Sequence, residues 1–233
     1  MATPSTVSSV QLQLQTVFGV RSKLDASLFF CDEQTVIYPA GNHFILANVE
    51  TKSQRIFRCQ ELEHIDWISV HHEAALIAIV ASRSSAEKQA TTISFYDLHT
   101  TVGKRKRVFE LRDAPMTIVS IAFSHDAKYL AVLDGGHREY TLSLWLWQKS
   151  RFIASLKLGH AEGVSVLSQI LFHPRDNNLV SIIGRRYCRF VRHLEGNLRI
   201  QPSSAKLDQY DFISHGMASH RSGVFFYANA ISF

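Results

Sequence analysis

Cysteine is scarce in this chain of 233 residues, and its spacing excludes two common ways of holding a fold together. The three cysteines, Cys31, Cys59 and Cys188, are far apart and form no CxxC or CxxH group. A disulfide framework needs cysteines in pairs, and a zinc knuckle needs them closely spaced. We therefore interpret the three as small buried apolar residues of a protein in a reducing compartment.

Long apolar runs are missing as well. The longest uninterrupted apolar run, Ala74–Ala81, is far shorter than the roughly 18 residues that would span a bilayer. No basic residue precedes Arg21, and glutamines interrupt the stretch where the apolar core of a secretory leader would lie. We expect no membrane contact, no leader and a location in the cytoplasm.

The composition excludes a disordered or collagen-like chain, because glycine and proline number only 11 and 5 while 46% of the residues are apolar. Apolar residues nowhere keep helical spacing over four turns. Short β-branched and aromatic runs alternate with turn residues instead, as at Thr35–Tyr38, Ile118–Phe123 and Leu142–Trp147. After a flexible lead-in at residues 1–16, the sequence predicts an all-β fold.

Two sets of residues recur along the chain with a common period. The first set stands at strand ends 49, 49 and 46 residues apart and comprises Ala47, Tyr96, Trp145 and Val191. The second set stands where strands enter turns, at steps of 53, 49 and 46 residues, and comprises Val70, Phe123, Phe172 and Ala218. The shared period indicates one structural unit that is repeated.

A period of this length with four short strands is typical of a β-propeller blade. Because one blade cannot bury both of its faces, each must pack on its neighbours around an axis. We predict a partial β-propeller at residues 17–233, with about four blades plus the start of a fifth. The predicted blades are residues 17–60, 61–112, 113–160 and 161–204, with an incomplete fifth at 205–233.

Five segments carry a family resemblance. They are Phe18–Arg21, Asp32–Asn42, Lys104–Val108, Ala122–Leu130 and Leu144–Lys149. In this order they resemble the amino-terminal WD-repeat region of the cilia- and flagella-associated protein 57 family. The resemblance implies a WD-repeat β-propeller in a non-enzymatic scaffold of the ciliary or flagellar axoneme. It also implies axonemal partners, such as inner dynein arm or microtubule-associated components, and a role in dynein arm placement and cilium motility.

The chain departs from that family in two respects. Family members are much longer, so missing blades or another chain would complete the propeller. WD repeats also tie a Gly-His pair to a Trp-Asp pair, whereas here Gly159-His160 is matched only by Val191-Arg192, and Tyr96-Asp97 is the nearest equivalent of Trp-Asp. We therefore expect degenerate repeats in which packing replaces that network.

Positive charge is concentrated in the second half of the chain, where residues 101–233 carry 18 basic and 10 acidic residues against 7 and 10 in residues 1–100. The candidate partner-binding residues are Lys104, Arg105, Lys106, Arg107, Arg185, Arg186, Arg189 and Arg192. The first four form a run that we expect between two strands at a blade's outer edge. The later arginines can bind carboxylates bidentately, which favours an acidic protein partner.

A nuclear or RNA-associated WD-repeat scaffold that uses the basic half remains an alternative. Nucleic acid is the less favoured partner, because no aromatic stacking platform accompanies the basic run. The discriminating observation is RNA binding that weakens steeply with salt.

Chemistry-bearing residues are present, but no supporting motif accompanies them. His71-His72-Glu73 is not HExxH, and neighbouring strand residues point to opposite faces. The loop Asp134–His137 holds an acid and a base without a nucleophile or phosphate-binding motif. We expect no metal, no cofactor and no reaction, with a small propeller enzyme whose site lies at the axis as the remaining alternative. Trp145 and Trp147 are expected on one strand, facing the core between blades.

Overall fold

Antiparallel sheets of consecutive strands make up the fold in the computed structural model. It describes residues 15–17, 28–59, 65–85, 88–98, 105–111, 117–135, 139–158, 166–202, 207–220 and 223–231. Within these ranges the chain forms four sheets of four strands and a fifth of two, and the only helical segments are two short 3-10 turns. The predicted lead-in lies outside the described residues up to residue 14, as do Lys104 and the Gly159-His160 pair.

The strands of each sheet follow one another in chain order. The first sheet contains β1 (Phe29–Phe30), β2 (Thr35–Ala40), β3 (His43–Asn48) and β4 (Gln54–Arg58). The second contains β5 (Trp67–His71), β6 (Leu76–Ser85), β7 (Lys88–Asp97) and β8 (Arg105–Leu111). The third contains β9 (Thr117–Phe123), β10 (Tyr129–Gly135), β11 (Tyr140–Leu146) and β12 (Arg151–Leu158), with the turn η1 (Trp147–Lys149) between the last two.

The rest of the chain continues the same pattern. The fourth sheet contains β13 (Leu167–His173), β14 (Asp176–Gly184), β15 (Tyr187–Leu194) and β16 (Asn197–Ile200). After η2 (Leu207–Gln209), the fifth sheet consists of β17 (Asp211–His220) and β18 (Gly223–Ile231).

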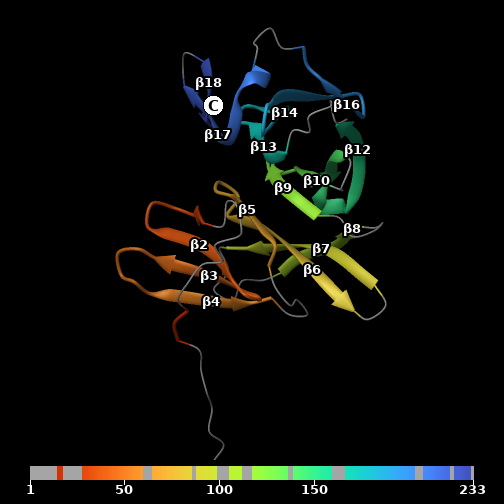
Figure 1. Ribbon diagram of the computed structural model, residues 1–233. Helices are drawn as coiled ribbons and strands as arrows, with labels where there is room; N and C mark the ends of the chain where they lie inside the picture. The colour runs from red at the N-terminus through yellow and green to blue at the C-terminus, as the bar shows by residue number, and fades with distance from the viewer. Residues whose placement is uncertain are drawn as a thin grey trace, which may run out of the picture.

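The sheets are arranged side by side along an arc, from the first sheet in orange to β17 and β18 in blue (Figure 1). The first strands of successive sheets contact one another, β5 with β9, β9 with β13 and β13 with β17. The fourth strand of each complete sheet lies at the outer edge of its strand order. This radial order confirms the predicted partial β-propeller of four blades and the start of a fifth.

In the second, third and fourth sheets, one residue of each repeated set lies in the same row across the sheet. Ile77 on β6 pairs with Val70 of the second set on one side and with Tyr96 of the first set on the other. Leu130 and Val180 occupy the same central place in the third and fourth sheets. The period in the sequence therefore reflects equivalent positions on the first and third strands.

Buried apolar residues fill the contact between each sheet and the next, which we call a seam. Alternate residues of β6 serve two seams: Ile77 and Ile79 pack toward the first sheet, whereas Ala78 and Val80 pack toward the third. All four are fully buried. A strand covered on both faces explains why Ala74–Ala81 reads as one continuous apolar run.

The two tryptophans of the third sheet differ in position. Trp147 does not share a strand with Trp145, because β11 ends at Leu146 and Trp147 opens η1. Trp147 is nonetheless buried in the second seam, where its ring stacks on Phe95 at 4.5 Å and its Nε1–H donates to the Ala127 carbonyl at 2.6 Å. Trp145 is half-buried and packs against the same cluster. The expected packing between blades holds for both, while the expected common strand is wrong.

Candidate protein-interaction surface

The basic run of the second sheet lies within a strand. Arg105, Lys106 and Arg107 belong to β8, the outermost strand of that sheet, whereas they were expected between strands. An edge strand tolerates charged residues because one of its sides faces solvent. Lys106 Nζ lies 2.9 Å from Asp97 Oδ2, and Arg107 donates to Ser150 Oγ at 3.2 Å. All three basic side chains are exposed.

The arginines of the fourth sheet are divided between the two ends of β15. Arg185 and Arg186 form the turn between β14 and β15, and Arg189 follows on β15 with its guanidinium 5.3 Å from the centre of the Tyr187 ring. Arg192 lies seven residues after Arg185, roughly 20 Å along an extended strand. There it donates to Asp176 Oδ2 at 2.8 Å. The structure therefore groups three of the four predicted arginines and separates Arg192 from them.

The Arg185-Arg186 turn is attached to the chain segments on both sides of it. The Arg185 N–H donates to the Val166 carbonyl at 2.8 Å, and the Arg186 N–H donates to the Tyr210 carbonyl at 3.1 Å. Gly184 precedes the turn at a position where a Cβ would lie 2.2 Å from the Val166 oxygen. Only glycine fits so close an approach of two backbones.

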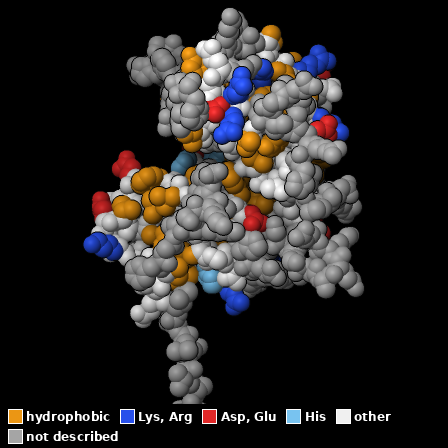
Figure 2. Space-filling view, in the orientation of Figure 1, with side chains coloured by type: hydrophobic (Ala, Val, Ile, Leu, Met, Phe, Trp, Pro, Cys, Tyr) orange, Lys and Arg blue, Asp and Glu red, His pale blue; other side chains and the backbone are white. Residues whose placement is uncertain are grey.

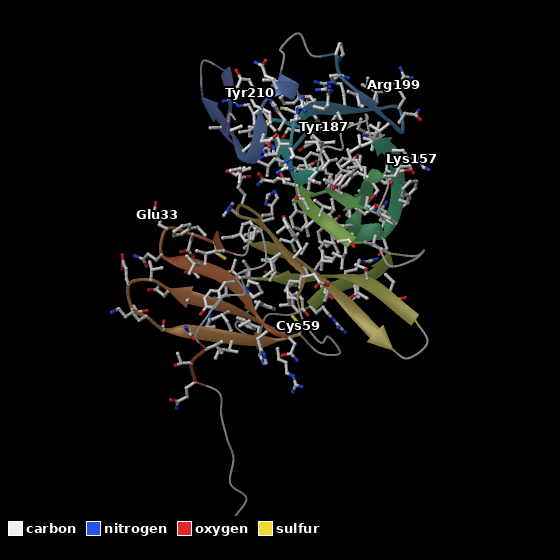
Figure 3. The ribbon with its side chains drawn as sticks, viewed as in Figure 1. Glu33, Cys59, Lys157, Tyr187, Arg199 and Tyr210 are labelled. Atoms are coloured by element: carbon white, nitrogen blue, oxygen red, sulfur yellow. The ribbon has the colours of Figure 1, made fainter. Side chains whose placement is uncertain are left out.

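Aromatic and apolar side chains surround this turn. Val166 and Tyr210 are 54% and 37% exposed, and Tyr187 is half-buried. Figure 3 places the labelled Tyr187 and Tyr210 at the end of the arc that carries β14 and β17. In Figure 2 Lys and Arg side chains gather over the same end, next to an acidic side chain. We call the set Val166, Arg185, Arg186, Tyr187, Arg189 and Tyr210 the arginine-turn surface.

Sequence reasoning did not find the apolar members of this surface. Val166 and Tyr210 belong to the segments that enter β13 and β17, so they approach the turn only through pairing between distant parts of the chain. The only signal in the sequence was the doublet of arginines beside Tyr187.

A groove of about 250 Å³ crosses the ends of the first strands on the side of the β5–β6, β9–β10 and β13–β14 hairpins. Its lining includes Val70, Phe123, Phe172 and four histidines, His71, His72, His125 and His173. Two of the histidines bond within the hairpins: the Ala74 N–H donates to His71 Nδ1, and the Arg175 N–H donates to His173 Nδ1. His71 Nε2 therefore carries the proton and donates to the His125 carbonyl at 2.8 Å.

This groove holds one carboxylate, that of Glu73, which lies 4.0 Å from His125 Nδ1. Among the described residues, no group of three or more His, Cys, Asp or Glu side chains could hold a metal ion. Burial raises the pKa of the Cys31 and Cys59 thiols to about 11, so neither is a thiolate at neutral pH. The groove is therefore lined by apolar side chains and by imidazoles, two of which cap the hairpin turns.

A buried polar cluster joins the fourth and fifth sheets. His215 on β17 lies between Gln169 Oε1, 3.0 Å from its Nδ1, and Ser181 Oγ, 2.6 Å from its Nε2. The His215 backbone N–H also donates to Gln169 Oε1 at 3.0 Å. Burial lowers the pKa of His215 to about 4, so the imidazole is neutral at pH 7. This cluster joins the first strands β13 and β17 of the two sheets, and its His215 and Ser181 side chains are buried.

The fold and its surfaces define a class of protein: a partial β-propeller that carries exposed basic side chains on its edge strand β8 and on the β14–β15 turn. The solved structure of Kluyvelomyces marxianus Hsv2 supports the fold, with a TM-score of 0.57 over 76% of this chain and 60% of that chain at 12% identity. No helix in the described ranges is long and apolar enough to cross a bilayer.

The relatives of the chain include cilia- and flagella-associated proteins. Cilia- and flagella-associated protein 57 of Mus musculus is 28% identical over 215 residues, which cover 91% of this chain and 17% of the mouse protein. Cilia- and flagella-associated protein 57 C of Tetrahymena thermophila is 26% identical over 194 residues, 79% of this chain and 14% of that protein. The resemblance drawn from the sequence is thus confirmed, and the chain spans a small part of each relative. No family model matches the chain.

Proposed function

We propose that this chain is a propeller segment of a protein-binding scaffold in the axoneme of a cilium or flagellum, and that it catalyses no reaction. The observation that carries the proposal is the similarity to a cilia- and flagella-associated protein over 91% of the chain. A propeller suits this role because its seams hold many loops in fixed relative positions, where several partners can bind at once.

The partners that we propose are axonemal proteins, either inner dynein arm components or microtubule-associated components. Binding to them would help to place the dynein arms and so affect motility. The proposed contacts are the exposed basic side chains of β8 and of the β14–β15 turn, because charged residues on rigid edges steer a partner and fix its orientation. Arg192 is a weaker candidate, since it pairs with Asp176 and its side chain is only 33% exposed.

The proposed function is tested by expressing the tagged chain in ciliated cells and extracting the membranes with detergent. We expect the tag to remain with the axoneme after extraction. A matched chain in which Trp147 is replaced by alanine tests whether retention depends on the folded propeller. Complete loss of the wild-type tag on extraction would refute the axonemal role.

A diffuse nuclear tag would instead support the alternative of a nuclear or RNA-associated scaffold. That alternative also requires RNA binding that weakens steeply with salt. The described basic residues favour a protein partner, because they lie on separate elements and three of them already pair with carboxylates. No binding of RNA at low salt would eliminate the alternative.

A further inference from the structure

We propose that the arginine-turn surface binds an acidic peptide segment that carries one apolar side chain among its carboxylates. The inference rests on the proposed function as a protein-binding scaffold and names the chemistry of a partner for one surface. Three features of the surface support it: a turn that is fixed before binding, arginines that can accept further carboxylates, and apolar side chains beside them.

The turn is fixed because both of its N–H groups are bonded to other segments. Arg185 is held by the carbonyl of Val166 and Arg186 by the carbonyl of Tyr210, so the turn cannot move without breaking contacts to β13 and β17. A partner that binds here does not have to order the backbone, and less conformational entropy is lost on binding. The same two bonds place Val166 and Tyr210 directly beside the arginines.

Arg186 occupies a backbone conformation that suits glycine better. Its φ is +52°, a left-handed value that a side chain makes unfavourable by about 1 kcal/mol. The side chain is exposed, and among the described residues no carboxylate lies within ion-pair distance of it. The position therefore carries a strained arginine whose side chain has no ion-pair partner among the described residues, and such a side chain can bind an external anion.

Arg185 and Arg189 complete the anion-binding part of the surface. Arg185 Nε lies 3.3 Å from Asp211 Oδ2, yet the arginine side chain remains 64% exposed and can donate to a second carboxylate. Arg189 lies over the Tyr187 ring, which limits its freedom. Residues 181–213 contain six Lys or Arg against three Asp or Glu, so the local charge favours an acidic ligand.

The apolar part distinguishes a peptide from a phosphate-rich ligand. Val166 is 54% exposed and Tyr210 is 37% exposed, both next to the turn. Tyrosine and arginine are enriched in protein interfaces, where they combine apolar area with hydrogen bonding. A nucleic acid would leave the exposed aliphatic side chain of Val166 without a matching group. An acidic segment with a single aliphatic or aromatic residue satisfies both parts.

The test measures fluorescence anisotropy of a labelled oligoglutamate peptide with a central leucine, titrated with the full chain at low and at high salt. We expect binding that weakens with salt, and weaker binding when serine replaces the leucine or glutamine replaces the glutamates. In the variant Arg186→Gly, the affinity is expected to fall roughly three- to fivefold. Its Tm should not decrease, because glycine relaxes the backbone at this position.

Lys52→Gly supplies a matched control. Lys52 is also exposed and has φ +55°, but it lies in the β3–β4 turn of the first sheet. This variant loses the same charge and gains the same backbone relief, so its affinity for the peptide should equal that of the wild type.

Three results would overturn the inference. They are no binding of the peptide at low salt, equal weakening by both glycine variants, and binding of single-stranded RNA that is tighter than binding of the peptide at equal salt and depends on Arg186. The first two leave the proposed function intact when the tag is still retained by the axoneme, so failure of the surface and failure of the scaffold role are distinguishable.

Discussion

Asp134 and His215 are two buried ionisable residues whose titrations oppose each other in mildly acidic solution. Asp134 ends the buried part of β10, and His215 lies between Gln169 and Ser181 in the fourth seam. Both residues are only 8% exposed. Burial raises the pKa of the Asp134 carboxyl from 3.8 to about 6 and lowers the pKa of His215 from 6.5 to about 4.

The two altered pKa values have opposite effects on the free energy of unfolding. For Asp134, the folded pKa lies above the unfolded value, so stability decreases as the pH rises from 3.8 to 6. For His215, the folded pKa lies below the unfolded value, so stability decreases as the pH falls from 6.5 to 4. Because a tenfold change in proton affinity corresponds to about 1.4 kcal/mol, each residue contributes about 3 kcal/mol. The two contributions nearly cancel in the wild type.

Replacing either residue should therefore expose the pH dependence of stability that the other residue contributes. Chemical denaturation of the wild type, Asp134→Asn and His215→Gln at a series of pH values measures the effect. Relative to the wild type, Asp134→Asn should gain about 3 kcal/mol between pH 4 and pH 6, and His215→Gln should lose a similar amount over that interval. If the free energy of unfolding depends on pH in the same way in all three proteins, the reasoning is refuted. A constant difference in stability between the proteins does not affect this test.

Three further predictions concern packing and surface charge. Trp147→Ala should lower the free energy of unfolding by about 3–5 kcal/mol in a urea titration, because a buried stacked ring is lost from the second seam. Trp145 is only half-buried, so Trp145→Ala should lower that free energy by less than half as much. Gly184→Ala should reduce stability by about 1–3 kcal/mol, seen as a lower Tm, because its Cβ would overlap a backbone carbonyl. Lys106→Ala should cost about 0.5 kcal/mol at low salt and less at high salt, since its pair with Asp97 is partly exposed.

The sequence allowed the sheets to be predicted wherever burial controls the residue pattern. The run at Thr35–Tyr38 lies in β2, where Val36, Ile37 and Tyr38 are buried. The run at Ile118–Phe123 lies in β9, whose alternate side chains face two seams. The apolar run Ala74–Ala81 did not show the full length of its strand, since β6 continues to Ser85. Beyond Ala81 the hairpin pairs polar residues, and it is the backbone pairing with β7 that maintains the strand. The apolar pattern of the sequence therefore cannot show where this part of the hairpin ends.

Only part of the candidate surface could be predicted from the sequence. Clustered arginines indicated an anion-binding region, but their spacing along the chain did not show that Arg192 would lie at the far end of β15. That division follows from the register of β14 and β15, which sets the turn at Arg185-Arg186. The neighbours of the turn come from other sheets, so their contribution depends on tertiary pairing.

Hydrogen bonds between first strands connect the sheets at the third and fourth seams, in addition to the apolar clusters there. Ser120 on β9 accepts the N–H of Ile170 on β13, and Gln169 accepts the N–H of His215 on β17. Each bond joins a sheet only to the next one. In repeat proteins, where each unit contacts only its neighbours, one interface can open while the others stay closed. The same behaviour is expected of the seams here.

The arginine-turn surface lies across the fourth seam, so binding there is coupled to closure of that seam. Among the described side chains, the fourth seam buries Ile183, Cys188 and Phe212, far fewer than the third seam, and it relies more on the His215 cluster. A ligand that contacts Arg186 and Tyr210 together bridges the fourth and fifth sheets, since their mutual bond already does so. It binds the closed seam better than the open one and stabilises it by linkage. Peptide binding should therefore slow hydrogen exchange in β17 more than in β9, and equal protection of both strands would contradict this coupling.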